Sequence, residues 1–239
     1  MVLATCAASL GLYKGLKSIS RARLIENTPT SKIRSAPQGY VEIVGKCHPP
    51  LSGKILSPLT QTDCVWFRYK VEKKNDKSWN TVKTGMSSQP ILCDDGTDIC
   101  AILPKNIHAS INNRTTWYGS TPLVSGISPV HFGGGRFRYT EELLQRDNQI
   151  YCLGNFITLN EPLNNGRSDN PAARLKLNEL QLNVYHTLSK PKDGSLFLLS
   201  NNSQSRLVSR IRRGGWIGIA VFFIGGGIAV RLLISRFIY

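Results

Sequence analysis

Two apolar segments lie at the ends of the chain, and a strand-like alternation of polar and apolar residues fills the region between them. The longer segment, residues 214–230, carries no charge over seventeen residues and is flanked by Arg213 and Arg231. A helix rises about 1.5 Å per residue, so this segment covers about 26 Å of a hydrocarbon layer about 30 Å thick. The apolar run continues through residues 232–234, and the pattern predicts a transmembrane helix over residues 214–234. A buried helix of a soluble protein is the alternative.

Side chains suited to a bilayer interface and to close helix packing accompany this segment. The predicted membrane-anchoring residues are Trp216, Phe222, Phe223, Arg213 and Arg231. Gly214, Gly218 and Gly226 present small surfaces that would let a second helix approach closely. That helix would come from the N-terminal segment or from a second copy of the chain, although glycine is also simply common in membrane helices.

The N-terminal segment is shorter, with thirteen uncharged residues before the first lysine. Its length is close to that of a signal-peptide core, but its positive charges follow the apolar run instead of preceding it. We therefore interpret residues 1–16 as a short transmembrane anchor followed by a basic linker, residues 17–38.

Basic residues flank both apolar segments on the side of the central region. Those expected to contact lipid headgroups are Lys14, Lys17, Arg21, Arg23, Arg206, Arg210 and Arg212. The positive-inside bias then predicts an integral membrane protein with two spans, with residues 24–205 in the cytoplasm and both termini outside.

The net charge of +15 raises the question of a nucleic-acid partner. Residues 14–34 and 206–236 hold twelve of the thirty basic residues and one acid, so most of the excess lies beside the apolar segments. A nucleic-acid-binding protein would instead carry a basic patch on its folded domain. We therefore expect membrane lipids and an unidentified protein as partners, and no nucleic acid.

The cysteines give no framework for a metal or a catalytic site. They are scattered as Cys6, Cys47, Cys64, Cys93, Cys100 and Cys152. No CxxC pair occurs, so we predict no metal, no cofactor and free buried thiols. Cys93 and Cys100 flank a predicted turn and could approach each other.

Alternating residues predict a sheet-rich central domain over residues 39–159. Strands are expected at residues 39–45 and 64–72, and residues 79–84 are expected to return as a hairpin partner of the latter. Asp94, Asp95 and Gly96 predict a second hairpin turn, because glycine tolerates positive φ.

The rest of the central region is less regular. Residues 104–135 are predicted to be rich in loops, and residues 136–144 and 149–159 to form a final pair of strands. Asn170 and Pro171 predict a helix start, and Leu177, Leu180, Val184 and Leu188 share one face at helical spacing. The fold class is therefore α+β: a β-rich domain and a helix near its C-terminal side, between two transmembrane helices. In the chain order this gives a helix and connector over residues 160–205, and then a basic juxtamembrane helix over residues 206–213.

Several blocks in the same order resemble the GIDE-type or "beside a membrane" (BAM) domain family. They are TPTSKIRSAPQGYVEIVGKCHP, LTQTDCVWFRYKVE, ILCDDGTDICAILP and RYTEELLQRDNQIYCLGNF, within residues 28–159. The family is best known from mitochondrial membrane-anchored E3 ubiquitin ligases. This chain is similar to the bacterial-type members that have two anchors and no RING, because no Cys or His follows Val230.

The resemblance leaves two hypotheses for function. The first is a membrane-anchored interaction or sensing module with no catalytic residues. The second is E3-type ubiquitin transfer, which the family name implies, with Cys47 beside His48, or Cys64, as a relay nucleophile. Such a nucleophile needs a base within reach and a lowered pKa, so we favour the first hypothesis.

Overall fold

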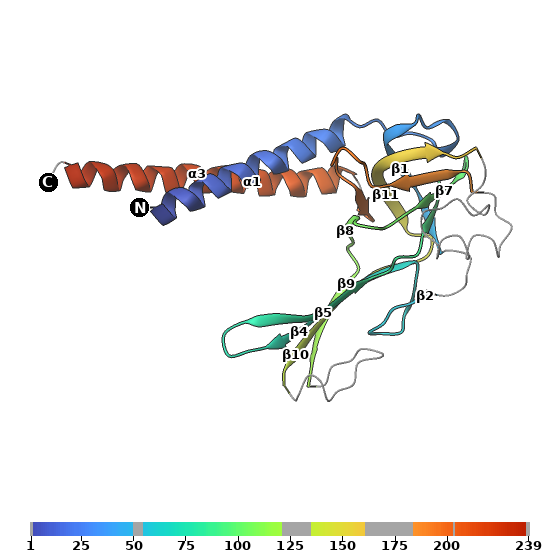
Figure 1. Cartoon of the computed structure of the whole chain (residues 1–239), viewed down its shortest axis with the longest axis horizontal. Coiled ribbons are helices and arrows are strands. Elements are labelled where there is room, and N and C mark those ends of the chain that lie inside the picture. The colour runs from blue at the N-terminus through green and yellow to red at the C-terminus, as the bar shows by residue number, and fades with distance from the viewer. Residues whose placement is uncertain (1, 50–54, 121–134, 161–183, 203, 238–239) are drawn as a thin grey trace. The chain divides into compact units, whose positions relative to one another are not determined.

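A computed structural model describes residues 2–49, 55–120, 135–160, 184–202 and 204–237. The chain divides into two compact units, one made of Met1–Pro29 with Ser203–Tyr239 and the other of Thr30–Asn202. The first unit consists of two long helices, α1 (Val2–Asn27) and α3 (Gln204–Phe237) (Figure 1). The second is built from strands, with one short 3-10 turn at Ile33–Ser35. The prediction of a β-rich domain with a C-terminal helix is therefore confirmed.

The prediction of two transmembrane spans is contradicted. Over the residues that the structure describes, neither helix is long and apolar enough to cross a membrane. α1 carries Lys14, Lys17, Arg21 and Arg23 along its length, and six of the seventeen uncharged residues in 214–230 are glycines, which add little apolar surface. The predicted localisation as a two-span membrane protein is therefore wrong. The cytoplasmic placement of the central domain was inferred from those spans, so it is no longer supported.

Five strands of the second unit close into a small barrel. They are β1 (Gly39–His48), β6 (Ile91–Asp94), β7 (Ile99–Ile102), β12 (His186–Ser189) and β11 (Gln149–Thr158). Each pairs with the next in that order, and β11 pairs back onto β1, so the ring of hydrogen bonds is complete. Among these five strands, β12 and β7 form the one parallel pair. Closure of this kind leaves no free edge within the ring.

The interior of the barrel holds the main apolar core. Ile43, Phe156 and Phe197 are fully buried there, together with Trp66. Alternation along β1 places Val41, Ile43 and Cys47 inward, as the polar and apolar pattern predicts. Two short strands, β13 (Leu198–Ser200) and β8 (His108–Ser110), extend this sheet beyond β11.

A second, four-stranded antiparallel sheet has the order β5-β4-β10-β9. Its strands are β4 (Trp66–Lys74), β5 (Trp79–Met86), β9 (Arg114–Gly119) and β10 (Phe137–Leu144). One face buries Tyr69, Val71, Phe137 and Tyr139, while the opposite face is polar. A two-stranded ribbon of β2 (Ile55–Leu56) and β3 (Asp63–Cys64) precedes β4.

Both predicted hairpins are confirmed. β4 and β5 pair as expected, and β6 and β7 turn at Gly96, whose φ of 82° is the left-handed conformation that glycine adopts without strain. The Asp94 carboxylate accepts a hydrogen bond from the Gly96 N–H at 2.7 Å.

Three expectations for the later part of the chain are wrong. β10 and β11 are consecutive but do not pair with each other, because β10 joins β4 and β9 while β11 joins the barrel. Two strands, β8 and β9, lie within residues 104–120 of the region predicted to be rich in loops, and residues 121–134 of that region lie outside the described residues. Leu188 lies in β12 and Val184 precedes that strand outside any helix; the predicted helix start at Asn170 and Pro171, and the chain up to residue 183, lie outside the described residues.

Candidate functional site

The two helices of the first unit run antiparallel and approach each other most closely at glycines. A Cβ added at Gly218 would lie 2.8 Å from the Gly11 carbonyl oxygen, and one at Gly15 would lie 2.9 Å from the Gly215 carbonyl oxygen. Of the predicted packing glycines, Gly218 lies in this contact with the N-terminal helix. A Cβ at Gly214 or Gly226 would meet nothing within 4 Å among the described residues. The backbone contact therefore uses only one face of α3.

The other faces of this helix pair expose large apolar side chains. Trp216 is 61% exposed and Phe223 is 69% exposed, while Phe222 is half-buried. The remaining exposed apolar residues of the pair are Leu10, Tyr13, Leu16, Ile217, Val221, Ile224 and Val230. Exposing a large apolar side chain to water forgoes about 1.5–3 kcal/mol of burial energy, so a surface of this extent indicates an apolar partner.

Basic residues border this apolar surface. The side chains of Lys14, Lys17, Arg21, Arg23, Arg206, Arg210, Arg212 and Arg213 are exposed, as is that of Arg231. Arg212 donates hydrogen bonds to the Glu26 carboxylate at 2.5 and 2.7 Å, which links α3 to α1. The pair therefore combines exposed apolar side chains with a strong positive charge.

The thiols of the β-rich unit are free and buried. Burial raises the pKa of the Cys47 thiol and of the Cys64 thiol to about 12. The Cys47 thiol donates a hydrogen bond to the Gln145 carbonyl oxygen at 3.1 Å, and the neighbouring His48 instead lies 3.2 Å from a carboxylate oxygen of Asp147. These surroundings are the reverse of those that activate a nucleophilic cysteine.

Three more cysteines meet inside the barrel. Cys93 lies directly opposite Cys47 on β1 and opposite Cys100 on β7, and Cys152 lies nearby on β11. Burial raises the pKa of each of these thiols as well. Among the described residues, no group of three or more His, Cys, Asp or Glu is arranged to hold a metal ion.

The polar face of the four-stranded sheet is strongly charged. It carries six cations, which we call the cationic face: Arg68, Lys70, Lys74, Arg114, Arg136 and Arg138. Two carboxylates lie among them. Glu72, whose side chain is 6% exposed, lies 2.6 Å from Lys70 and 2.8 Å from Arg138. The hydrogen bond from Arg138 holds the pKa of Glu72 below its usual value.

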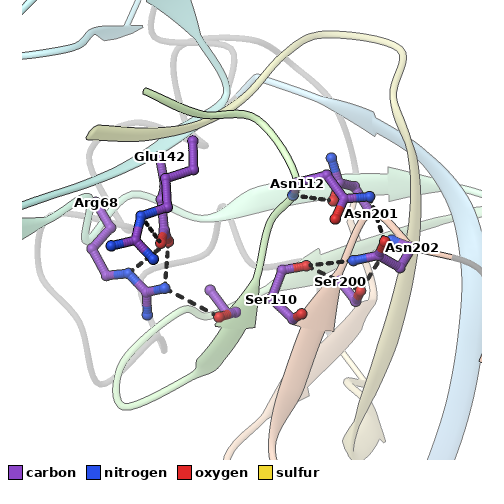
Figure 2. Close-up of polar contacts among 9 residues, drawn as sticks. Arg68, Ser110, Asn112, Glu142, Ser200, Asn201 and Asn202 are labelled. Carbon is purple, nitrogen blue, oxygen red and sulfur yellow. Dashed lines mark hydrogen bonds and ion pairs between the residues drawn. The ribbon is translucent and has the colours of Figure 1, made fainter. Parts of the chain in front are cut away.

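The second carboxylate, Glu142, organises the other end of the cationic face. It accepts hydrogen bonds from Arg68, as Figure 2 shows, and lies 4.0 Å from Arg114, which is largely exposed. An open cavity of about 480 Å³ lies at this end. Its lining includes Arg68, Lys70, Arg114, Glu142, Tyr69 and Met86.

Two aromatic rings lie at the opposite end of the cationic face. The Trp79 and Tyr118 rings are 5.8 Å apart, and the Arg138 guanidinium lies 4.7 Å from the centre of the Trp79 ring. Lys74 also lies over Trp79, and Arg136 lies over Tyr118. Each ring therefore already has a cation against it.

A network of asparagines and serines holds β8 and the turn that follows it (Figure 2). Asn112 donates its side-chain N–H to the Asn202 side-chain oxygen and its backbone N–H to the Asn201 side-chain oxygen, and Asn202 in turn donates to the Ser110 carbonyl oxygen at 3.3 Å. Arg68 donates to the Ala109 carbonyl oxygen at 3.2 Å, so this network also fixes the end of the cationic face that holds the cavity.

Sequence reasoning missed the cationic face because its strands come from distant parts of the chain. The alternation of residues in the sequence of β4 places Arg68, Lys70 and Glu72 on one face, and the same rule applied to β10 groups Arg138 with Glu142. The missing information was that β10 pairs with β4.

Comparison with protein-family models, with curated proteins and with solved structures finds no match. The resemblance to the GIDE-type family therefore stays a prediction.

Proposed function

We propose that this chain is a non-catalytic interaction module that binds a lipid surface through its helix pair and a protein partner through its β-rich unit. The observation that carries the proposal is the exposed apolar surface of the helix pair beside a cluster of exposed basic residues. Lipid offers both an apolar layer and anionic headgroups. The proposal concerns contact with a lipid surface and requires no spanning helix.

The magnitudes favour an anionic surface. Each basic residue near such a surface contributes about 1 kcal/mol, and the attraction falls within a Debye length of about 8 Å at physiological salt. Arg206, Arg210 and Arg213 together should therefore contribute about 3 kcal/mol, which corresponds to an affinity difference on the order of a hundredfold.

Sedimentation with vesicles tests this proposal. The full chain is mixed with phosphatidylcholine vesicles that contain or lack phosphatidylserine, and the bound fraction is measured at low and high salt. We expect binding to the anionic vesicles, weakened on the order of a hundredfold when Arg206, Arg210 and Arg213 are all replaced by Gln. A matched triple variant, with Lys105, Arg146 and Lys192 replaced by Gln, removes three exposed charges of the β-rich unit and should bind as the wild type does. Equal binding by both variants would overturn the proposal.

The surroundings of the thiols support the non-catalytic part of the proposal. A relay cysteine must form a thiolate, and burial opposes this at Cys47 and Cys64. Incubation of the chain with ubiquitin, activating enzyme and charged conjugating enzyme should leave no reducible ubiquitin adduct on the chain. An adduct lost in the Cys47→Ser or Cys64→Ser variant would instead support the transferase hypothesis.

A further inference from the structure

We propose that the cationic face binds an acidic, extended segment of a partner protein, which adds to the four-stranded sheet along β5. This inference rests on the proposed function as an interaction module and names the chemistry of the protein partner.

The positive charge of the cationic face indicates that its ligand is negatively charged. Six cations share the face with two carboxylates, Glu72 and Glu142, and both carboxylates are nearly buried beneath them. Arg114 and Arg136 are exposed at opposite ends of the face, so their charges are directed to the solvent. A complementary partner must supply negative charge along a length that matches the strands.

The edge of the sheet gives the conformation of the ligand. Among the described residues, β5 pairs with β4 on one side and with no strand on the other. β5 is eight residues long, and Asn80, Thr81, Thr84 and Met86 are exposed along it. An extended peptide can add to such an edge by backbone hydrogen bonds, and every second side chain of the peptide then lies on the cationic face.

The cavity gives one place for a side chain of the peptide. Met86 of β5 and Arg68 of β4 lie opposite each other at its wall, next to Glu142. Its volume of about 480 Å³ exceeds one side chain, and its lining combines Met86 with the cations Arg68, Lys70 and Arg114. A glutamate side chain matches this lining, because its methylenes meet apolar atoms and its carboxylate meets a guanidinium.

A peptide fits this face better than single-stranded nucleic acid does. Base stacking needs free aromatic faces, whereas cations already lie against the rings of Trp79 and Tyr118. A nucleic acid also has no backbone groups that can extend a sheet, which leaves the edge of β5 unused.

Fluorescence anisotropy with synthetic probes tests the inference on the full chain. The probe is a labelled eight-residue peptide that alternates Glu and Val, compared with the same peptide built from Lys and Val. We expect the acidic peptide to bind and the basic one not to bind. Methylation of alternate backbone nitrogens of the acidic peptide should abolish binding, because it removes the donors for the sheet. Equal binding of the methylated peptide would overturn the addition to β5.

Charge variants locate the binding site. Replacing Lys70 and Lys74, which lie on β4 next to β5, by Gln should weaken binding of the acidic peptide about tenfold at low salt, because each ion pair at the surface contributes up to about 1 kcal/mol. The matched double variant, with Lys105 and Arg146 replaced by Gln, should bind the peptide as the wild type does. Equal weakening by both variants, or a poly-deoxythymidine probe that binds and displaces the peptide, would overturn the inference.

The same samples separate this inference from the lipid proposal. The Lys70→Gln, Lys74→Gln variant retains the helix pair, so it should sediment with anionic vesicles as the wild type does. If the wild type binds anionic vesicles but does not bind the acidic peptide, this inference is overturned and the lipid proposal stands.

Discussion

Replacement of Gly218 by Ala tests the contact between α1 and α3. The added Cβ would lie 2.8 Å from the Gly11 carbonyl oxygen and 3.1 Å from the Gly15 Cα, well inside the usual separation of about 3.5 Å. These neighbours are backbone atoms, so the helices themselves must move apart. Overpacking of this kind costs about 1–3 kcal/mol, whereas alanine gains about 1 kcal/mol over glycine in a helix.

Gly226→Ala is the matched control, because a Cβ at that position meets none of the described residues within 4 Å. Gly226→Ala gains helix propensity without a clash against α1. The helix pair should therefore be about 1–3 kcal/mol less stable in Gly218→Ala than in Gly226→Ala.

Hydrogen exchange of the α1 amides, read by mass spectrometry, measures that difference. Each 1.4 kcal/mol corresponds to about a tenfold change in the exchange rate of amides that open with the pair. We therefore expect exchange about fivefold to a hundredfold faster in Gly218→Ala than in Gly226→Ala. Identical exchange in the two variants would refute the glycine contact.

Three further predictions concern the β-rich unit. Phe156→Ala removes a fully buried ring from the barrel and should lower the free energy of unfolding by about 3–5 kcal/mol, whereas Ile157→Ala, at a half-exposed neighbour, should cost much less; equal losses in urea titration would contradict the assignment of the core. The folded-state pKa of Glu72 is lowered, so its contribution is present above the unfolded pKa of about 4.3 and is lost as the pH falls through the folded pKa. Glu72→Gln should therefore cost about 1 kcal/mol at neutral pH and nothing in strong acid, and a cost independent of pH would argue against the ion pairs. Cys47, Cys64, Cys93, Cys100 and Cys152 should resist iodoacetamide at neutral pH and react in urea, and rapid alkylation of any of them in the folded chain would contradict their burial.

The local parts of the fold could be predicted from the sequence. Alternation along residues 39–45 and the turn at Gly96 depend on neighbouring residues only, and both are present as expected. The same holds for the polar side of β4, where Arg68, Lys70 and Glu72 share one face.

The long-range parts could not be predicted in the same way. The residues of β10 and β11 carry ordinary strand patterns, and nothing in those patterns states that consecutive strands join different sheets. The cationic face depends on this pairing, because Arg138 meets Glu72 only when β10 lies beside β4. For the terminal segments, the apolar pattern indicated helices correctly, but the prediction that these helices cross a membrane was wrong.

The contact between α3 and lipid is the central claim, and quenching of tryptophan fluorescence by brominated acyl chains tests it most directly. Trp216 is 61% exposed on the helix pair, whereas Trp66 is fully buried in the β-rich unit. The proposal predicts that anionic vesicles with brominated chains quench part of the emission of the chain, and that Trp216→Phe removes this quenching. Emission unchanged by brominated vesicles, or quenched equally in Trp216→Phe, would contradict it.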